Sequence, residues 1–224
     1  MDVIWLGQAG LLFENGDVRI MVDPYLSNSV ERVNSLNYRR VPINEDFFQI
    51  RPDVIVLTHD HLDHTDPETL ERYLKKYDGI TVLASKNAWN TIQRFGGNHN
   101  YVMFNRSTTW TEHNIRFTAV KAEHSDDCAV GVIIDDGFKK YYVTGDTLYN
   151  EDIFGDMPKD IYSVFLPING VGNNMNVIDA AHFANKINAK KVVPIHFGMF
   201  DELDPKKFVC KNKVIPQLYN KIDL

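Results

Sequence analysis

The stretch DVIVLTHDHLDHTDP, residues 53–67, determines how this chain is organised. Residues 53–57 form a short apolar run, as expected for a strand in a sheet that is covered on both faces. Histidines and aspartates follow directly, and residues 67–76 have helical spacing with Pro67 in the first turn. The stretch therefore predicts a buried strand, a polar connection and a helix, in that order.

The polar connection has the composition of a metal site. It holds three imidazoles and two carboxylates within the six residues His59 to His64. Imidazole and carboxylate together suit Zn²⁺, Mn²⁺ or Fe²⁺. Two histidines two positions apart on an extended segment face the same side and can bind one metal, and after the chain turns, Asp63 and His64 can face a second. Metal binding explains better than helix capping or turn formation why five such groups converge at one strand end.

Three further candidate ligands each follow a predicted strand. His124 follows residues 115–120, Asp146 follows residues 140–144, and His196 follows residues 191–195. A lone histidine is more often a structural residue. Strand ends on one side of a sheet are, however, where ligands gather in α/β architectures. We therefore expect these three side chains to complete the metal site.

The remaining pattern consists of strands, then alternating strands and helices, twice over. The Asn15-Gly16 pair predicts a hairpin turn, and the irregular stretch of residues 25–50 is long enough to suggest a functional loop, such as a lid. The order fits two packed sheets with helices outside better than one doubly wound sheet, in a single domain of residues 1–224. Besides those above, the predicted elements are strands 3–6, 11–14, 18–22, 80–84, 129–135 and 161–166, and helices 86–95 and 176–187.

Composition excludes several classes of protein. The net charge of −6 disfavours sequence-independent nucleic-acid binding, which depends on a basic surface. The sequence contains no apolar run long enough to predict a membrane span or a secretory signal. Two cysteines make no disulfide framework and indicate a reducing compartment, so we expect a cytoplasmic protein. Its expected partner is a small molecule, and the sequence leaves a homo-oligomer possible.

The order HxHxDH, then a histidine, then aspartate in TGD, then a late histidine resembles the metallo-β-lactamase superfamily. Within it, four segments look like the L-ascorbate-6-phosphate lactonase branch, and the resemblance extends from residue 2 to about residue 208. They are LGQAGLLFENGDVRIMVDPYLS, RPDVIVLTHDHLDHTDPETL, FLPINGVGNNMN and VVPIHFGMF.

This resemblance implies an α/β protein with an αββα four-layer sandwich and a two-metal site at one edge. It implies Zn or Mn, with Fe possible. By position, Asp146 would bridge the metals, and Asp23 would orient a ligand imidazole from behind. The first metal would be held by His59, His61 and His124, and the second by Asp63, His64 and His196.

The activity implied is hydrolysis by a metal-bound hydroxide that opens a lactone or ester of a small, anionic, sugar-like substrate. Asp63 and Asp146 would take part in catalysis, and Asp63 could move a proton to the leaving group. Arginine pairs with carboxylate or phosphate, and polar residues near the ligands could also bind substrate. The candidate substrate contacts are Arg39, Arg40, Ser125, Asp126, Asn169 and Asn176, of which Asn176 could instead be a helix N-cap.

Three other functions remain open. The same two-metal chemistry could attack the phosphorus of a small phosphodiester. A redox di-iron centre fits less well, because Leu62-Asp63-His64 matches the hydrolytic pattern. A catalytically silent metal-binding module is the non-enzymatic alternative.

Overall fold

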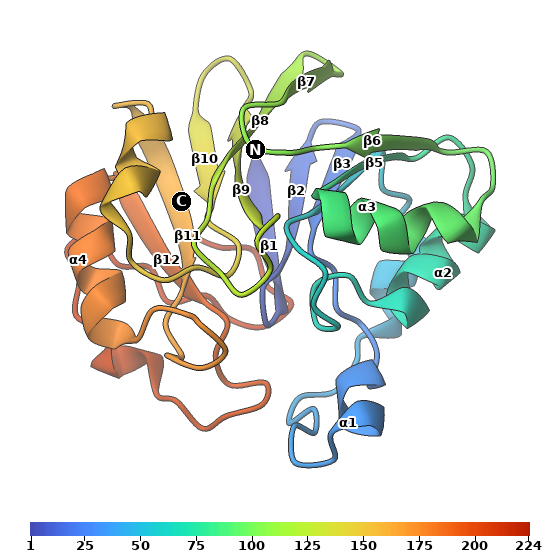
Figure 1. The fold of residues 1–224 in the computed structure, drawn as a ribbon. Helices are drawn as coiled ribbons and strands as arrows, with labels where there is room; N and C mark the ends of the chain where they lie inside the picture. Colours follow the sequence, from blue (N-terminus) through green and yellow to red (C-terminus); the bar gives the residue numbers. More distant parts are fainter.

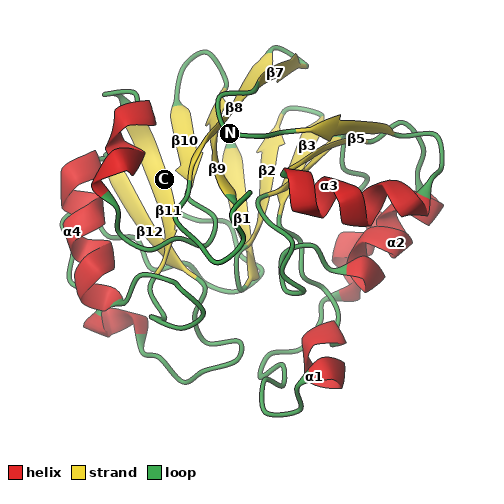
Figure 2. Ribbon diagram, viewed as in Figure 1, coloured by secondary structure: helices red, strands yellow, loops and turns green.

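Two six-stranded sheets pack face to face, with helices on their outer sides (Figure 1). The computed structural model describes residues 1–224. The strand order is β1-β2-β3-β4-β5-β6 in one sheet and β12-β11-β10-β9-β8-β7 in the other. Figure 2 shows α2 and α3 on one side of the sheets and α4 on the other. This arrangement confirms the predicted α/β sandwich.

The first sheet begins with an antiparallel hairpin pair and continues as a parallel sheet. Gly16, with φ of 61°, makes the tight turn between β2 and β3, which confirms the hairpin predicted from Asn15-Gly16. The strands are β1 (Asp2–Gly7), β2 (Gly10–Asn15), β3 (Val18–Val22), β4 (Val54–Leu57), β5 (Thr81–Ala84) and β6 (Asn100–Met103).

The outer face of this sheet is covered by α2 (Pro67–Lys76) and α3 (Lys86–Ile92). Asp66 caps α2, because its side chain accepts hydrogen bonds from the first free backbone amides of the helix. Helix α2 buries Leu70, Tyr73 and Leu74 against the sheet. Residues 25–50 are not wholly irregular, since they contain α1 (Ser29–Val33) and the 3₁₀ helix η1 (Glu45–Gln49).

The second sheet mixes antiparallel and parallel pairs. Helix α4 (Val177–Ile187) covers its outer face and is capped by Asn176. The strands are β7 (Thr109–Glu112), β8 (Ile115–Lys121), β9 (Val130–Asp135), β10 (Lys140–Val143), β11 (Ile161–Pro167) and β12 (Lys191–Ile195). Three further 3₁₀ helices are η2 (Gln93–Phe95), η3 (Glu151–Asp156) and η4 (Pro205–Lys207).

The main hydrophobic core lies between the two sheets. Phe13 of the first sheet makes edge contacts with Tyr141 and Phe165 of the second, with ring centroids 5.8 and 5.6 Å apart. The C-terminal segment is tied to the first strand, because the Ile222 amide donates to the Val3 carbonyl. This packing fixes the sheets relative to each other, and so fixes the loops at their common edge. No helix combines the length and apolar character that a membrane crossing requires.

Candidate metal centre

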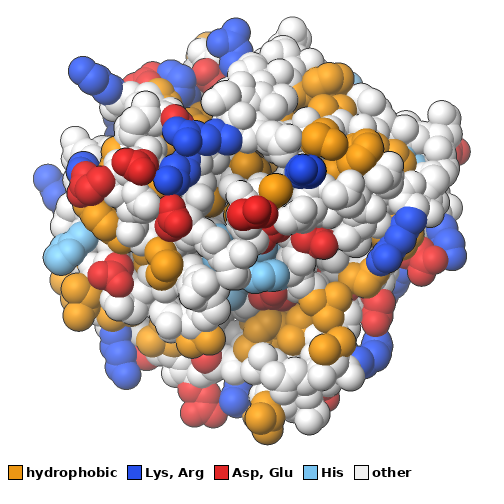
Figure 3. All heavy atoms as spheres, in the orientation of Figure 1, with side chains coloured by type: hydrophobic (Ala, Val, Ile, Leu, Met, Phe, Trp, Pro, Cys, Tyr) orange, Lys and Arg blue, Asp and Glu red, His pale blue; other side chains and the backbone are white.

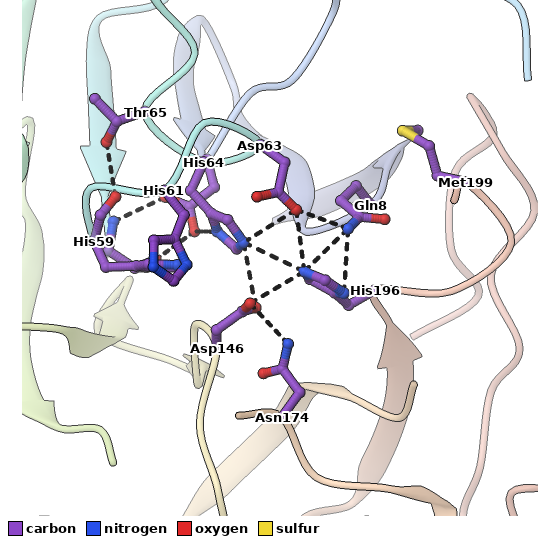
Figure 4. A network of polar contacts seen from close by, with 12 residues as sticks. Gln8, His59, His61, Asp63, His64, Thr65, Asp146, Asn174, His196 and Met199 are labelled. Atoms are coloured by element: carbon purple, nitrogen blue, oxygen red, sulfur yellow. Dashed lines mark hydrogen bonds and ion pairs between the residues drawn. The ribbon is translucent and has the colours of Figure 1, made fainter. Parts of the chain in front are cut away.

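The predicted ligands converge at one edge of the sandwich (Figure 4). The loop after β4 supplies four of them, and the loops after β8, β10 and β12 supply one each. In Figure 4 the side chains of Asp63, His64, Asp146 and His196 point toward one another. The four strand ends therefore bring together residues that are up to 137 positions apart in the sequence, from His59 to His196.

Three histidines form the first group of ligand atoms. The rings of His59, His61 and His124 are 4.6 to 4.8 Å apart, centroid to centroid. His61 Nδ1 lies 3.1 Å from His124 Nε2. His59 is completely buried, and its Nε2 has no hydrogen-bond partner. Three ring nitrogens facing one point, one of them buried without a partner, are what a cation with imidazole ligands requires.

The second group joins a carboxylate to two histidines, Asp63, His64 and His196. Asp63 Oδ2 lies 3.4 Å from His196 Nε2 and 3.7 Å from His64 Nε2. The two Nε2 atoms are 3.4 Å apart. These atoms again face one point, and they form a second triad of possible metal ligands.

Asp146 lies at the second group. Its Oδ2 is 3.2 Å from His196 Nε2, and its Oδ1 is 3.3 Å from His64 Nε2. Oδ1 is buried without a hydrogen-bond partner. Asn174 Nδ2 donates to Oδ2 over 2.7 Å and so fixes the rotation of the carboxylate. Asp146 is thus held rigidly, with one oxygen free to bind a cation.

Several side chains hold the ligands from behind. Asp23 Oδ2 lies 2.8 Å from His64 Nδ1, and both residues are fully buried. Asp23 also accepts hydrogen bonds from the Thr58 amide and hydroxyl, so it ties the end of β3 to the end of β4. The Asn169 side-chain amide lies 3.0 Å from His196 Nδ1. The Asp23 contact sets the orientation of the His64 ring and leaves its Nε2 for the metal.

Gln8 is a site residue that the sequence analysis missed. Its Nε2 donates to Asp63 Oδ2 over 2.8 Å. The same atom is 3.2 and 3.1 Å from the two ring nitrogens of His196, which places it over the ring face. The Gln8 carbonyl accepts from the His196 amide. The signal that could have revealed it is a polar residue between two glycines in a turn after a buried strand.

The backbone at this edge adopts unusual conformations. Gln8, Asp23 and His196 have φ of 50°, 44° and 57°, in the left-handed region that side-chain-bearing residues rarely adopt. Gly145 has φ of 63°, and a Cβ there would lie 3.0 Å from both Thr58 Cβ and the Val130 carbonyl. Backbone strain of this kind concentrates at functional sites.

The charges of the second group stabilise each other. Burial lowers the pKa of His196, but Asp146 and Asp63 outweigh it and raise the pKa to about 9. Burial also opposes a charge on Asp63, yet the neighbouring His64 and His196 hold its pKa below the usual range. Buried carboxylates in this group therefore require positive charge beside them. Protons on the imidazoles supply it in the metal-free protein, and a divalent cation meets the same requirement.

A pocket of about 320 Å³ opens over the second group. Neither lysine nor arginine lines it. Two residues of the 25–50 segment, Val30 and Asn37, reach it, so this segment forms one wall. The other lining residues are Gln8, His61, Asp63, Asp146, Asn169, Val171, Gly172, His196, Phe200 and Asp201.

Of the predicted substrate contacts, only Asn169 lines this pocket. The Arg39 guanidinium donates instead to the Tyr25 and Val41 carbonyls and to the Tyr219 hydroxyl. Arg40 pairs with Glu202. Both arginines hold loops together and neither lines this pocket, so their contact with a substrate stays a prediction.

The other three predicted contacts lie elsewhere. Asn176 is the N-cap of α4, and its side chain accepts from the Ile178 and Asp179 amides. Ser125 and Asp126 line a neighbouring polar hollow of about 490 Å³, which shares His61 with this pocket and also contains Arg94. Asp126 accepts hydrogen bonds from the Asp60 amide, the Asn87 side chain and the Cys128 amide. It therefore joins the loop of His59 to the loop of His124.

Comparison with known proteins places the chain in a family. Residues 18–197 match the model of the beta-lactamase superfamily domain. A UPF0173 metal-dependent hydrolase of Exiguobacterium sp. is 28% identical over 214 residues, which cover 89% of this chain and 87% of that protein. One from Staphylococcus aureus is 29% identical over 233 residues, with 93% and 91% covered.

Solved structures share the fold. The crystal structure of a possible metal-dependent hydrolase from Veillonella parvula superimposes with a TM-score of 0.80 at 14% identity, and covers all of this chain and 99% of that one. Together with the family match and the two ligand triads, this shows that the chain belongs to the metallo-β-lactamase superfamily of metal-dependent hydrolases.

Proposed function

We propose that the chain hydrolyses an ester or lactone of a small molecule in the pocket over the second ligand group. The observation that supports this most strongly is the position of the ligand atoms. Asp63, Asp146 and His196 lie in the wall of a 320 Å³ pocket, so a small substrate there would contact the metal site directly.

The donor set fits two divalent ions, one held by His59, His61 and His124 and the other by Asp63, His64 and His196, with Asp146 beside the second group. Bound there, such ions would lower the pKa of water from 15.7 toward about 7 and polarise the substrate carbonyl. Zinc and manganese both accept these ligands, and iron is a further candidate.

The chain's own residues would position the groups that react. Gln8 holds Asp63 through Oδ2. This leaves Oδ1 of Asp63 to accept a proton from the attacking water and to pass it to the leaving alkoxide oxygen. Asn174 keeps the Asp146 carboxylate in a fixed orientation through its hydrogen bond to Oδ2. In a lactone the leaving alkoxide stays attached, and the product is a hydroxy acid.

A carbonyl substrate fits the pocket better than a phosphodiester. A phosphodiester carries a permanent negative charge, and besides metal ions proteins usually bind such groups with arginine or lysine. The pocket has neither, and Asp201 adds a carboxylate to its lining.

The test compares purified protein loaded with zinc or manganese against protein treated with a chelator. The substrates are simple lactones, an aryl acetate and a bis-aryl phosphodiester. We expect metal-dependent ring opening that falls by about 10²- to 10⁴-fold in Asp63→Asn. The matched control is Asp17→Asn, an exposed aspartate in the β2–β3 turn. Faster turnover of the phosphodiester would establish the alternative activity, and no turnover of any substrate at full metal occupancy would indicate a silent module.

A further inference from the structure

The lining of the metal pocket includes three apolar side chains, Val30, Val171 and Phe200, which we call its apolar mouth. Besides the candidate ligands Asp63, Asp146 and the histidines, Asp201 is the one charged residue of the lining. A substrate in the pocket can contact these apolar side chains as well as the metal site.

Val171 is held in an exposed position by its own loop. It is 65% exposed, and Gly170 and Gly172 on either side both have φ of 68°. Its amide donates to Asn169 Oδ1, in the same residue that contacts His196. The loop therefore presents an exposed valine in the same pocket lining as the candidate ligand His196, and leaves it free to contact a substrate.

The opposite side of the mouth is formed by the segment after β3 and the loop after β12. Val30 lies in α1, and the Phe200 ring makes an edge contact with Tyr25, with centroids 5.8 Å apart. Figure 3 shows hydrophobic side chains between the histidine at the centre of this face and its lower edge, on the side where Figure 1 draws α1.

The charges around the mouth favour a neutral substrate. The arginines near Val30 and Asn37 in the sequence are bound to other groups: Arg32 to Glu68, Arg39 to backbone carbonyls and Tyr219, and Arg40 to Glu202. Asp201 Oδ1 accepts from the Gly198 and Leu203 amides, which fixes its carboxylate at the pocket. An anionic substituent would meet this carboxylate with no cationic side chain to offset it.

We propose that the pocket selects an uncharged ester or lactone that carries an apolar substituent, which packs between Val171 and Phe200 at the mouth. The proposal rests on the function proposed above for the reacting bond. It adds the chemical class of the substituent attached to that bond. This substituent is apolar and uncharged, whereas the sequence led us to expect an anionic, sugar-like substrate.

The first experiment compares three lactones of one ring size: unsubstituted, with an alkyl chain, and with a chain of equal length ending in a carboxylate. Each buried methylene contributes about fourfold to binding. We expect kcat/KM for the alkyl lactone to exceed that for the carboxylate-bearing lactone by at least about tenfold. Equal or faster turnover of the carboxylate-bearing lactone would overturn the proposal and leave the hydrolase function intact.

Two variants locate the selectivity. Val171→Ser should reduce the ratio of kcat/KM between the alkyl and unsubstituted lactones by about fourfold or more. Val209→Ser, at a valine that is 78% exposed and outside the pocket, should leave the ratio unchanged. Asp201→Asn keeps the Oδ1 acceptor and removes the charge, so it should raise the relative turnover of the carboxylate-bearing lactone. An unchanged ratio in both pocket variants would contradict the proposal.

A binding measurement separates this proposal from the hydrolase function. Cyclic ketones with the same alkyl or carboxylate chains cannot be hydrolysed, and their binding to metal-loaded protein can be followed by calorimetry. If the alkyl ketone binds more tightly but no lactone is turned over, the proposed selection of an apolar substituent is supported and the proposed lactone hydrolysis is contradicted. Tighter binding of the carboxylate ketone would contradict the apolar mouth, whatever the turnover.

Discussion

Asp23 Oδ2 lies 2.8 Å from Nδ1 of His64, and neither side chain is exposed to solvent. Asp23 directly follows β3 and His64 lies in the loop after the neighbouring parallel strand β4. Their contact turns Nε2 of His64 toward Asp63, Asp146 and His196. The orientation of the candidate ligand His64 thus depends on Asp23, which contacts the opposite ring nitrogen.

Asp23→Asn should weaken binding at the second metal position. The amide keeps the shape of the side chain but loses the charge that orients His64. Changes of this kind behind a metal ligand typically cost about 10- to 100-fold in affinity. The quantity to measure is the dissociation constant of the more weakly bound metal ion, by competition with a chromophoric chelator. Asp17→Asn is the control. Unchanged affinity would show that Asp23 only supports the fold.

Gln8→Leu should also weaken metal binding, because it removes the hydrogen bond to Asp63 Oδ2 and the amide over the His196 ring. We expect a loss of about tenfold or more in affinity at the second position and little change at the first. Elemental analysis after dialysis against a dilute chelator measures it. Gln217→Leu, at an exposed glutamine, is the matched control. Equal retention of metal by Gln8→Leu and the control would contradict the assigned position of Gln8.

Asp126→Ala should destabilise the protein. It removes the acceptor for the Asp60 and Cys128 amides and the Asn87 side chain. For a partly exposed carboxylate we expect a loss of about 2 kcal/mol in the free energy of unfolding, or about 4 to 8 °C in Tm for a chain of this size. Calorimetry of the metal-free variant tests this, with the exposed neighbour variant Asp127→Ala beside it. A raised KM with unchanged Tm would instead restore the role in substrate binding predicted from the sequence.

Metal affinity should rise with pH. In the metal-free protein, burial lowers the pKa of His196, but Asp146 and Asp63 outweigh it and raise the pKa to about 9, so the ring holds a proton at neutral pH. Metal binding must displace that proton, and raising the pH removes the competitor. The apparent affinity should increase up to tenfold per pH unit for each proton released, and level off above about pH 9. Calorimetry in two buffers of different ionisation enthalpy counts the protons. Affinity that is independent of pH between about 6.5 and 9 would contradict this assignment.

Much of the fold follows from local sequence patterns. The strand Val18–Val22 and the helix Pro67–Lys76 match their predicted bounds, because a hairpin turn and a proline at the helix start mark them. Strands Asn100–Met103 and Thr109–Glu112 were not predicted. Both are short and only partly buried, and each lies at an edge of its sheet, so neither has the apolar run of a central strand.

In the site, too, some features follow from local sequence and others only from tertiary packing. The convergence of the candidate ligands could be predicted, because a metal site needs particular side chains at particular strand ends. The partners of Arg39 could not, since Tyr219 lies 180 positions away and becomes a neighbour only through tertiary packing. The apolar mouth was missed for a similar reason. Val30, Val171 and Phe200 carry no motif and come together only when helix α1 and two loops meet.

The most direct test of the central claim, a two-metal site, is the metal content of protein purified without added metal. Elemental analysis would compare the natural chain with His61→Ala and with the control His113→Ala, whose histidine lies outside both ligand groups. The structure predicts close to two zinc, manganese or iron ions per chain, a clear loss in His61→Ala and no loss in His113→Ala. A chain that contains no metal and takes up none on titration would contradict the metal centre and every function proposed from it.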